Sequence, residues 1–203
     1  MRQSKVIGVT GGVGAGKSTL LAYVKENKGC SVILADDVGR RLSGRGKCVY
    51  RALLASYGEE ILDAEGNIDR KRLYEKAFTG EAADVSRLNR LTHPLIRREI
   101  RRMITIDPSP LIFLEAALLY EGKLDTLCTD VWYVASPAEL RKQRLYESRG
   151  YSEERSDSIM KNQLRDEEFR GYCPYVIEND GSLADLYAKI DRRLREIGAE
   201  YAD

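Results

Sequence analysis

Residues 6–19 read VIGVTGGVGAGKST, a short apolar run followed by a glycine-rich turn and the start of a helical pattern. Within them, Gly11, Gly16, Lys17 and Ser18 satisfy the P-loop spacing G-x-x-x-x-G-K-[ST]. Glycines let the backbone turn tightly and bring its N–H groups close to phosphate oxygens, and the following helix directs its positive end at the same anion. In such a loop Lys17 contacts the β- and γ-phosphates and the Ser18 hydroxyl binds Mg²⁺. The sequence therefore predicts a nucleotide site.

The alternative is a glycine-rich turn that binds nothing, but the strand before the loop and the helix after it supply the context that a P-loop needs. The residues expected to contact the nucleotide are those of the loop and of the first helical turn: Gly12, Gly14, Ala15, Gly16, Lys17, Ser18 and Thr19.

Composition narrows the class of protein. Of the 203 residues, 43% are hydrophobic and 32% are charged, which is typical of a soluble globular chain that buries a core. The net charge of +1 creates no strong field toward nucleic acid or membranes, and no apolar run is long enough to cross a membrane. Four scattered cysteines and a single histidine argue against a zinc site or a disulfide framework. We expect a reduced, cytoplasmic protein.

Short apolar runs alternate with helical patterns along most of the chain. After the run that precedes the P-loop, four more lie at residues 30–34, 111–114, 131–135 and 175–179. This alternation predicts an α/β protein with a three-layer P-loop kinase fold, in which helices flank a five-stranded parallel sheet. Trp132 and Tyr133 are expected to pack in the core of that sheet.

The alternation stops between residues 46 and 106, where apolar residues recur at helical spacing, with an interruption expected at His93-Pro94. We therefore expect residues 1–45 and 107–203 to form the nucleotide-binding core and residues 46–106 to form an all-helical insertion. The charge run at residues 148–170 is either a solvated helix face or part of a lid, at about residues 141–170, that carries mobile arginines.

Two acids, Asp36 and Asp37, follow the second apolar run. Ligands of open α/β sheets bind outside the carboxyl ends of the strands, so these acids are expected on the side of the phosphate site. The alternative is that they cap the next helix, which suits Asp37 better than Asp36. The short chain, the acid after the second strand and the helical insertion favour a small-molecule kinase over a switch GTPase or a motor.

The chain resembles the dephospho-coenzyme A kinase family over nearly its whole length. The resemblance rests on these segments and residues: 7–19; 32–36 with Arg40; 57–62 with Gly66, 68–70 and Leu73; 88–89; 93–96; 118–121; Gln163; and 176–182. It implies ATP-dependent phosphorylation of the ribose 3′-hydroxyl of dephospho-coenzyme A.

The resemblance also implies roles for single residues. Asp36 matches the acid near the acceptor hydroxyl, the proposed general base, and Arg144 matches a lid arginine. Asn179 lies in the segment that contacts the adenine of ATP, and the helical insertion corresponds to the coenzyme A-binding domain. In that insertion the candidates for contact with acceptor phosphates are Arg70, His93, Arg97 and Arg98. For His93, a hydrogen bond that fixes a helix start is an equally good interpretation.

The chain departs from the family pattern at several positions. Leu34 and Glu115 each stand where the family usually has aspartate, and Ala117 and Pro174 replace a proline and an aspartate. Glu115 leaves open a role near Mg²⁺, directly or through water. The expected partners are ATP and dephospho-coenzyme A, with no nucleic acid or membrane, for a monomer or a small homo-oligomer. The alternatives are another P-loop kinase that acts on a nucleoside monophosphate or a sugar, and a non-catalytic ATP-binding regulator.

Overall fold

The structure, a computed structural model, describes residues 4–78, 85–161 and 163–198. Its contacts divide the chain into two compact units. The first, here the core unit, comprises Met1–Ile33 and Asp107–Asp203, and the second, here the insertion unit, comprises Leu34–Ile106.

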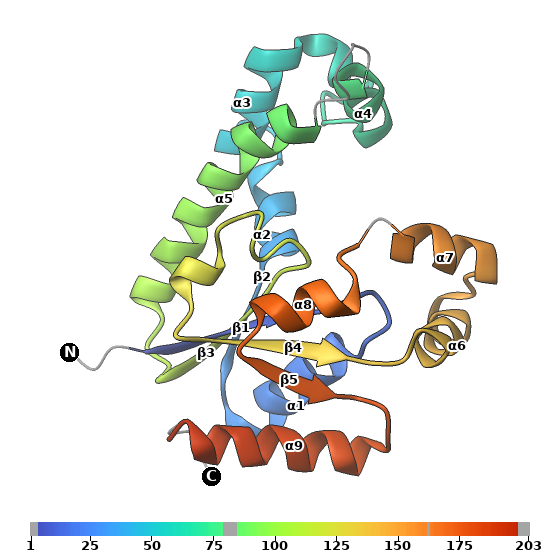
Figure 1. Cartoon of the computed structure of the whole chain (residues 1–203). Coiled ribbons are helices and arrows are strands. Elements are labelled where there is room, and N and C mark those ends of the chain that lie inside the picture. Colours follow the sequence, from blue (N-terminus) through green and yellow to red (C-terminus); the bar gives the residue numbers. More distant parts are fainter. Residues whose placement is uncertain (1–3, 79–84, 162, 199–203) are drawn as a thin grey trace. The chain divides into compact units, whose positions relative to one another are not determined.

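A five-stranded parallel sheet forms the centre of the fold, in the order β2-β3-β1-β4-β5 (Figure 1). The strands are β1 (Lys5–Thr10), β2 (Ser31–Leu34), β3 (Leu111–Glu115), β4 (Asp130–Ala135) and β5 (Tyr175–Glu178). Strand β1 is central because it pairs with β3 on one side and with β4 on the other. The register places Val9 beside both Glu115 and Trp132, so the chain enters the P-loop from the middle of the sheet.

The apolar runs form strands because both of their faces are buried, as in other parallel sheets. Ile7, Phe113 and Trp132 have no exposed surface, and the rings of Phe113 and Trp132 meet edge to face with their centroids 5.5 Å apart. The Trp132 indole N–H donates to Asp130 Oδ2 at 2.9 Å, so its polar atom is also satisfied. The expected place of Trp132 and Tyr133 in the core is confirmed.

Helices complete the core unit. They are α1 (Lys17–Lys28), α6 (Ala138–Arg149), α7 (Glu153–Lys161), α8 (Asp166–Tyr172) and α9 (Leu183–Glu196). Helices α1 and α9 pack together on one face of the sheet and α8 lies over the other face, which gives the expected three layers (Figure 1). Helix α1 ends as its sequence predicts, with Gly29 in the left-handed conformation at φ 58° and its N–H bonded to Val24 O.

The insertion unit is helical, with α2 (Ala35–Leu42), α3 (Cys48–Tyr57), α4 (Arg70–Phe78) and α5 (Val85–Ile106), and a 3₁₀ turn at Glu59–Ile61. Helix α2 packs against α3 and α5, and this packing places the division of the chain at Leu34 and not at residue 46, where the sequence pattern had suggested it. No helix among the residues described has the length and apolar character needed to cross a membrane.

Two local expectations are wrong. Helix α5 runs through Pro94 without a break, so His93 lies inside the helix and does not mark its start. An interior proline removes one hydrogen bond and its ring crowds the carbonyl of residue i−4. The packing of this 22-residue helix against α2 and α3 offsets that cost. Asp37 does not cap α2, because Leu34 occupies the N-cap position; Asp37 instead pairs with Arg40 at 3.1 Å on the exposed first turn.

Candidate active site

The P-loop joins β1 to α1 and depends on glycine at three positions. Gly11, Gly14 and Gly16 have φ values of 144°, 76° and 100°, which L-residues with side chains rarely adopt. A Cβ atom on Gly11 would lie 2.6 Å from Val134 O, so the loop also needs glycine in order to pack against β4. Gly16 is the N-cap of α1, and the loop therefore leads directly into the positive end of the helix dipole.

Side-chain donors hold the carbonyl groups of this loop. Lys17 Nζ donates to Gly11 O at 2.7 Å and to Gly12 O at 3.2 Å. Asn179, which is 5% exposed and follows β5, donates its Nδ2 to Ala15 O at 2.7 Å. Because these donors occupy the carbonyl side of the peptide groups, the N–H side is the one that suits an anion.

Replacing Asn179 with alanine should lower the free energy of unfolding by about 1–3 kcal/mol, because the Ala15 carbonyl would lose its buried donor. Urea denaturation measures this. Asp180→Ala is the control at the neighbouring position, since Asp180 is exposed and its side chain pairs with Lys189 at the surface. Equal stability of the two variants would contradict a tethering role for Asn179.

Three residues at the start of α1 and the end of β3 offer the chemistry of a metal-phosphate site. Glu115 Oε1 lies 3.8 Å from Lys17 Nζ, and Ser18 is exposed in the first turn of α1. Hydroxyl and carboxylate oxygens are the ligands that Mg²⁺ prefers, and Mg²⁺ usually takes one or two protein oxygens together with substrate phosphates. The Ser18 and Glu115 oxygens fit a Mg²⁺ ion that is bound together with substrate phosphates. The described residues contain no group of three or more His, Cys, Asp or Glu that could hold a metal ion alone.

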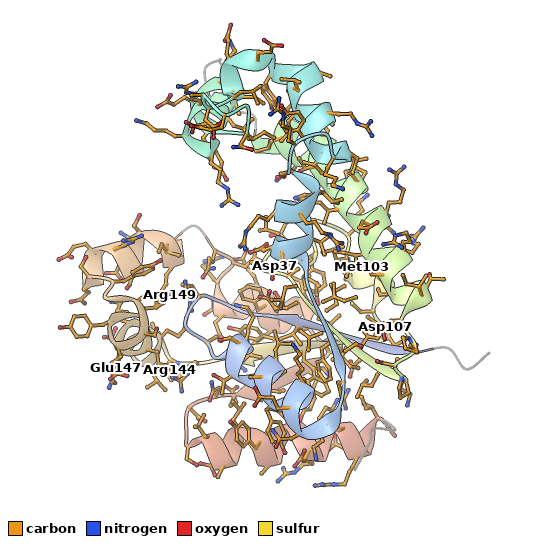
Figure 2. All side chains as sticks on the ribbon, turned by 180° about the vertical axis from the view of Figure 1, so that it is seen from behind. Asp37, Met103, Asp107, Arg144, Glu147 and Arg149 are labelled. Atoms are coloured by element: carbon orange, nitrogen blue, oxygen red, sulfur yellow. The ribbon has the colours of Figure 1, made fainter. Side chains whose placement is uncertain are left out.

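Arg144 projects from α6 toward the strand ends of the core unit. Its Nη1 donates to Ser136 Oγ at 3.1 Å and its Nη2 donates to Asn179 O at 3.3 Å. Figure 2 shows Arg144 with Glu147 and Arg149 on the same helix. The structure thus brings Arg144 and Asn179 into contact, and Asn179 binds the P-loop, whose carbonyl groups also bind Lys17.

Two further contacts to the P-loop had no role in the sequence-based site. Arg141 Nε donates to Val13 O at 2.8 Å, and Gln163 Oε1 accepts the Val13 N–H at 2.9 Å. Burial lowers the pKa of Arg141, partly opposed by Tyr133 and Asp166. Gln163 belonged to the family resemblance, but Arg141 lies in a charged helix whose periodicity does not mark any single arginine.

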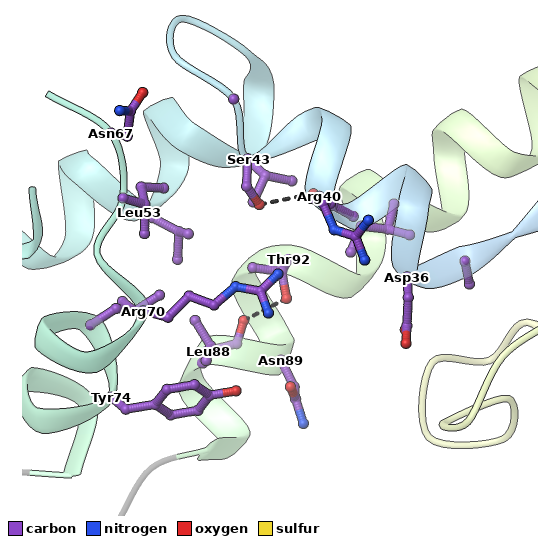
Figure 3. A pocket seen from close by; sticks show the side chains of 17 residues that line it. Asp36, Arg40, Ser43, Leu53, Asn67, Arg70, Tyr74, Leu88, Asn89 and Thr92 are labelled. Atoms are coloured by element: carbon purple, nitrogen blue, oxygen red, sulfur yellow. Dashed lines mark hydrogen bonds between the residues drawn. The ribbon is translucent and has the colours of Figure 1, made fainter. Parts of the chain in front are cut away.

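The insertion unit contains its own cavity, of about 480 Å³, whose walls come from α2, α3, α4 and α5 (Figure 3). Its polar lining includes Asp36, Arg40, Arg70, Tyr74 and Asn89, and its apolar lining includes Leu53. Two of the acceptor candidates, Asp36 and Arg70, are among these residues. The other three, His93, Arg97 and Arg98, lie on α5 and are not among the described residues that line this cavity.

Two guanidinium groups, one carboxylate and an apolar wall suit a ligand that has both anionic and apolar parts. Arg70 extends into this cavity from α4, and Asp36 and Arg40 extend from α2 (Figure 3). The volume lies in the range of small-molecule sites, about 300–1,000 Å³.

Comparison with known proteins identifies the family to which the chain is similar. The family model for dephospho-CoA kinase matches residues 5–185. A dephospho-CoA kinase of Corynebacterium diphtheriae is 39% identical over 193 residues, which are 94% of this chain and 95% of that protein.

Two solved structures extend the likeness to the fold. One, from Thermus thermophilus, superposes with a TM-score of 0.80 at 29% identity and covers 96% of this chain and 98% of its own. The dephospho-CoA kinase of Campylobacter jejuni has a TM-score of 0.67 at 25% identity and covers 95% and 96%. The family match and the curated relative agree over both units of the chain, and the chain therefore belongs to the dephospho-CoA kinase family.

Proposed function

We propose that this protein transfers the γ-phosphoryl group of ATP to the ribose 3′-hydroxyl of dephospho-coenzyme A, giving coenzyme A and ADP. This is the last step of coenzyme A synthesis. The observation that carries the proposal is the family match over residues 5–185, which includes both the P-loop and every residue of the insertion-unit cavity.

On the donor side, Gly12, Gly14, Ala15, Gly16 and Thr19 form the phosphate-binding loop and the first turn of α1. Lys17 would exchange its hydrogen bonds with the loop carbonyls for the β- and γ-phosphate oxygens. Mg²⁺, when bound, would neutralise charge on the transferred phosphoryl group, with the Ser18 hydroxyl as a ligand and Glu115 acting directly or through water. Arg144 would stabilise the charge that develops in the transition state, and the segment at Asn179 would contact adenine.

On the acceptor side, Asp36 would orient the 3′-hydroxyl and accept its proton. Phosphoryl transfer passes through a loose transition state, so orientation contributes more than early removal of the proton. Arg70 would bind an acceptor phosphate in the insertion-unit cavity, and His93 and Arg97 are further candidates on α5. In this proposal residues 46–106 hold the acceptor and residues 141–170 act as a lid.

The test is an ADP-release assay with ATP, Mg²⁺ and dephospho-coenzyme A, in which coenzyme A is identified by mass spectrometry. Nucleoside monophosphates and sugars are run as competing acceptors. Turnover of one of these in place of dephospho-coenzyme A would identify a different small-molecule kinase. ATP binding without transfer to any acceptor would identify a regulator and contradict the proposal.

We further propose that the enzyme acts in the cytoplasm as a monomer or a small homo-oligomer and without a nucleic-acid partner. The net charge of +1 gives no general attraction to a polyanion.

Arg70→Met should raise the KM for dephospho-coenzyme A by about 10- to 100-fold, because a charged hydrogen bond to a phosphate contributes about 1.5–3 kcal/mol. The KM for ATP should stay the same. Lys71→Met is the matched control, because Lys71 is the next residue of α4, is exposed and pairs with Glu75 at 3.9 Å. An unchanged KM for the acceptor in Arg70→Met would remove Arg70 from the acceptor site.

A further inference from the structure

One peptide group at the tip of the P-loop is held on both sides by side chains from a distant part of the chain. Arg141 of α6 binds the carbonyl of Val13 at 2.8 Å, and Gln163, between α7 and α8, binds its N–H at 2.9 Å. Arg141 Nη2 also donates to Gln163 Oε1 at 3.2 Å. The three residues therefore form a closed ring of hydrogen bonds.

The P-loop and α6 are also closely packed around this ring of hydrogen bonds. A Cβ atom on Gly12 would lie 2.8 Å from Arg141 Nη1 and closer still to its Nη2 and Cζ atoms. A Cβ atom on Gly14 would lie 2.8 Å from Arg141 O. Both glycines that flank Val13 thus allow α6 to rest directly on the loop, and Arg141 contacts the loop through its side chain and through its backbone.

We infer that Arg141 and Gln163 are positioning residues that set the orientation of the Val13 peptide and so prepare the P-loop for the triphosphate. This pair is here called the Val13 latch. The inference rests on the proposed ATP site, and it deepens that proposal by naming the residues that preform it.

The Val13 latch completes a set of hydrogen bonds that holds the peptide groups of the P-loop. Lys17 holds the carbonyls of Gly11 and Gly12, and Asn179 holds that of Ala15. The Val13 latch fixes the peptide group between those positions. A loop whose peptide groups are already fixed loses less conformational entropy when phosphate binds, which favours affinity. Arg141 is partly desolvated, and its charge is therefore less screened than that of an exposed arginine.

The latch also joins the P-loop to the segment proposed as the lid. Arg141 lies on α6, and Gln163 follows α7. Any movement of residues 141–170 away from the loop must break these hydrogen bonds, so nucleotide affinity and the position of the segment are coupled.

The experiment measures the dissociation constants of ATP and ADP by calorimetry in the presence of Mg²⁺, for the full-length protein and for three variants. Gln163→Leu, which keeps the size but removes the acceptor oxygen, should weaken ATP binding by about tenfold. Arg141→Met should weaken it by about 10- to 100-fold. The double variant should lose less than the product of the two single effects, because both residues hold the same peptide.

Matched controls are Gln143→Leu on the exposed face of α6, where Gln143 bonds to Glu147, and Arg195→Met on the exposed surface of α9. Both should bind ATP like the unchanged protein. In turnover, the latch variants should raise the KM for ATP and leave the KM for the acceptor unchanged. Thermal unfolding of each variant is recorded, so that binding is measured well below its midpoint.

Two results would overturn the inference. If Arg141 acted through its charge alone, Gln163→Leu would bind ATP normally. If the latch served only stability, the unfolding midpoints would fall while both dissociation constants stayed the same. These results are distinct from failure of the proposed reaction, because nucleotide binding is measured without an acceptor. Weakened ATP binding in both variants would support the latch even if dephospho-coenzyme A were not phosphorylated.

Discussion

Replacing Asp36 with asparagine should lower kcat with dephospho-coenzyme A by about 10²–10⁴-fold, the usual contribution of a positioned general base. The amide is the same size as the carboxylate but cannot accept the proton of the hydroxyl. We expect the lower part of this range, because a loose transition state draws little on the strength of the base. ATP affinity should be nearly unchanged, because Asp36 lines the insertion-unit cavity and no contact between Asp36 and the nucleotide is proposed.

Asp37→Asn is the matched control for this variant. Asp37 is also exposed on the first turn of α2, but it pairs with Arg40 and is not among the cavity residues. Loss of this surface ion pair should change stability by less than about 1 kcal/mol and should leave turnover intact. Steady-state kinetics measures kcat for both variants, and nucleotide titration measures their affinity for ATP. A normal kcat in Asp36→Asn would remove Asp36 from catalysis.

Much of the fold could be predicted because local and global signals agree. The glycine pattern at residues 11–16 predicted the P-loop, and Gly29 predicted the end of α1. The apolar runs predicted all five strands to within about a residue, since a parallel strand must be apolar on both faces.

The errors arose where tertiary packing outweighs a local rule. Pro94 breaks the expected helical pattern in sequence, but α5 continues through it because α2 and α3 pack along the helix. The same packing draws α2 into the insertion unit. The contacts of α5 with α2 and α3 cannot be read from the sequence, because they join residues that are far apart along the chain.

The candidate site, too, could be predicted only where a motif or the family resemblance names a residue. The P-loop motif names Lys17 and Ser18, and the family resemblance names Asp36, Arg144 and Asn179. Arg141 was not singled out because the segment from α6 to α8 is rich in charge, and charged residues are usually solvated. Only the fold shows which arginine turns inward, with its guanidinium group against Gly12 and its Nε bonded to Val13 O.

Lys17→Met should lower kcat/KM for ATP by about 10²–10³-fold, the usual cost of removing one donor that stabilises charge in a transition state. Methionine keeps most of the length of lysine but cannot bind the β- and γ-phosphate oxygens. It would also leave Glu115, now 3.8 Å from Lys17 Nζ, without this cation in the nucleotide site. A negative charge there would repel the triphosphate, so both nucleotide affinity and turnover should fall.

The control is Lys25→Met in the same helix, because Lys25 is exposed in the last turn of α1, away from the P-loop. Its loss should cost about 0.3–1 kcal/mol of stability through the helix dipole and should leave the kinetics unchanged. The KM for dephospho-coenzyme A should be the same in both variants, because no acceptor role is proposed for either lysine. Lys17→Met could keep a normal kcat/KM for ATP while Lys25→Met behaves as expected. The P-loop would then not be the site of the phosphoryl donor, and the proposed transfer from ATP bound in this loop would be wrong.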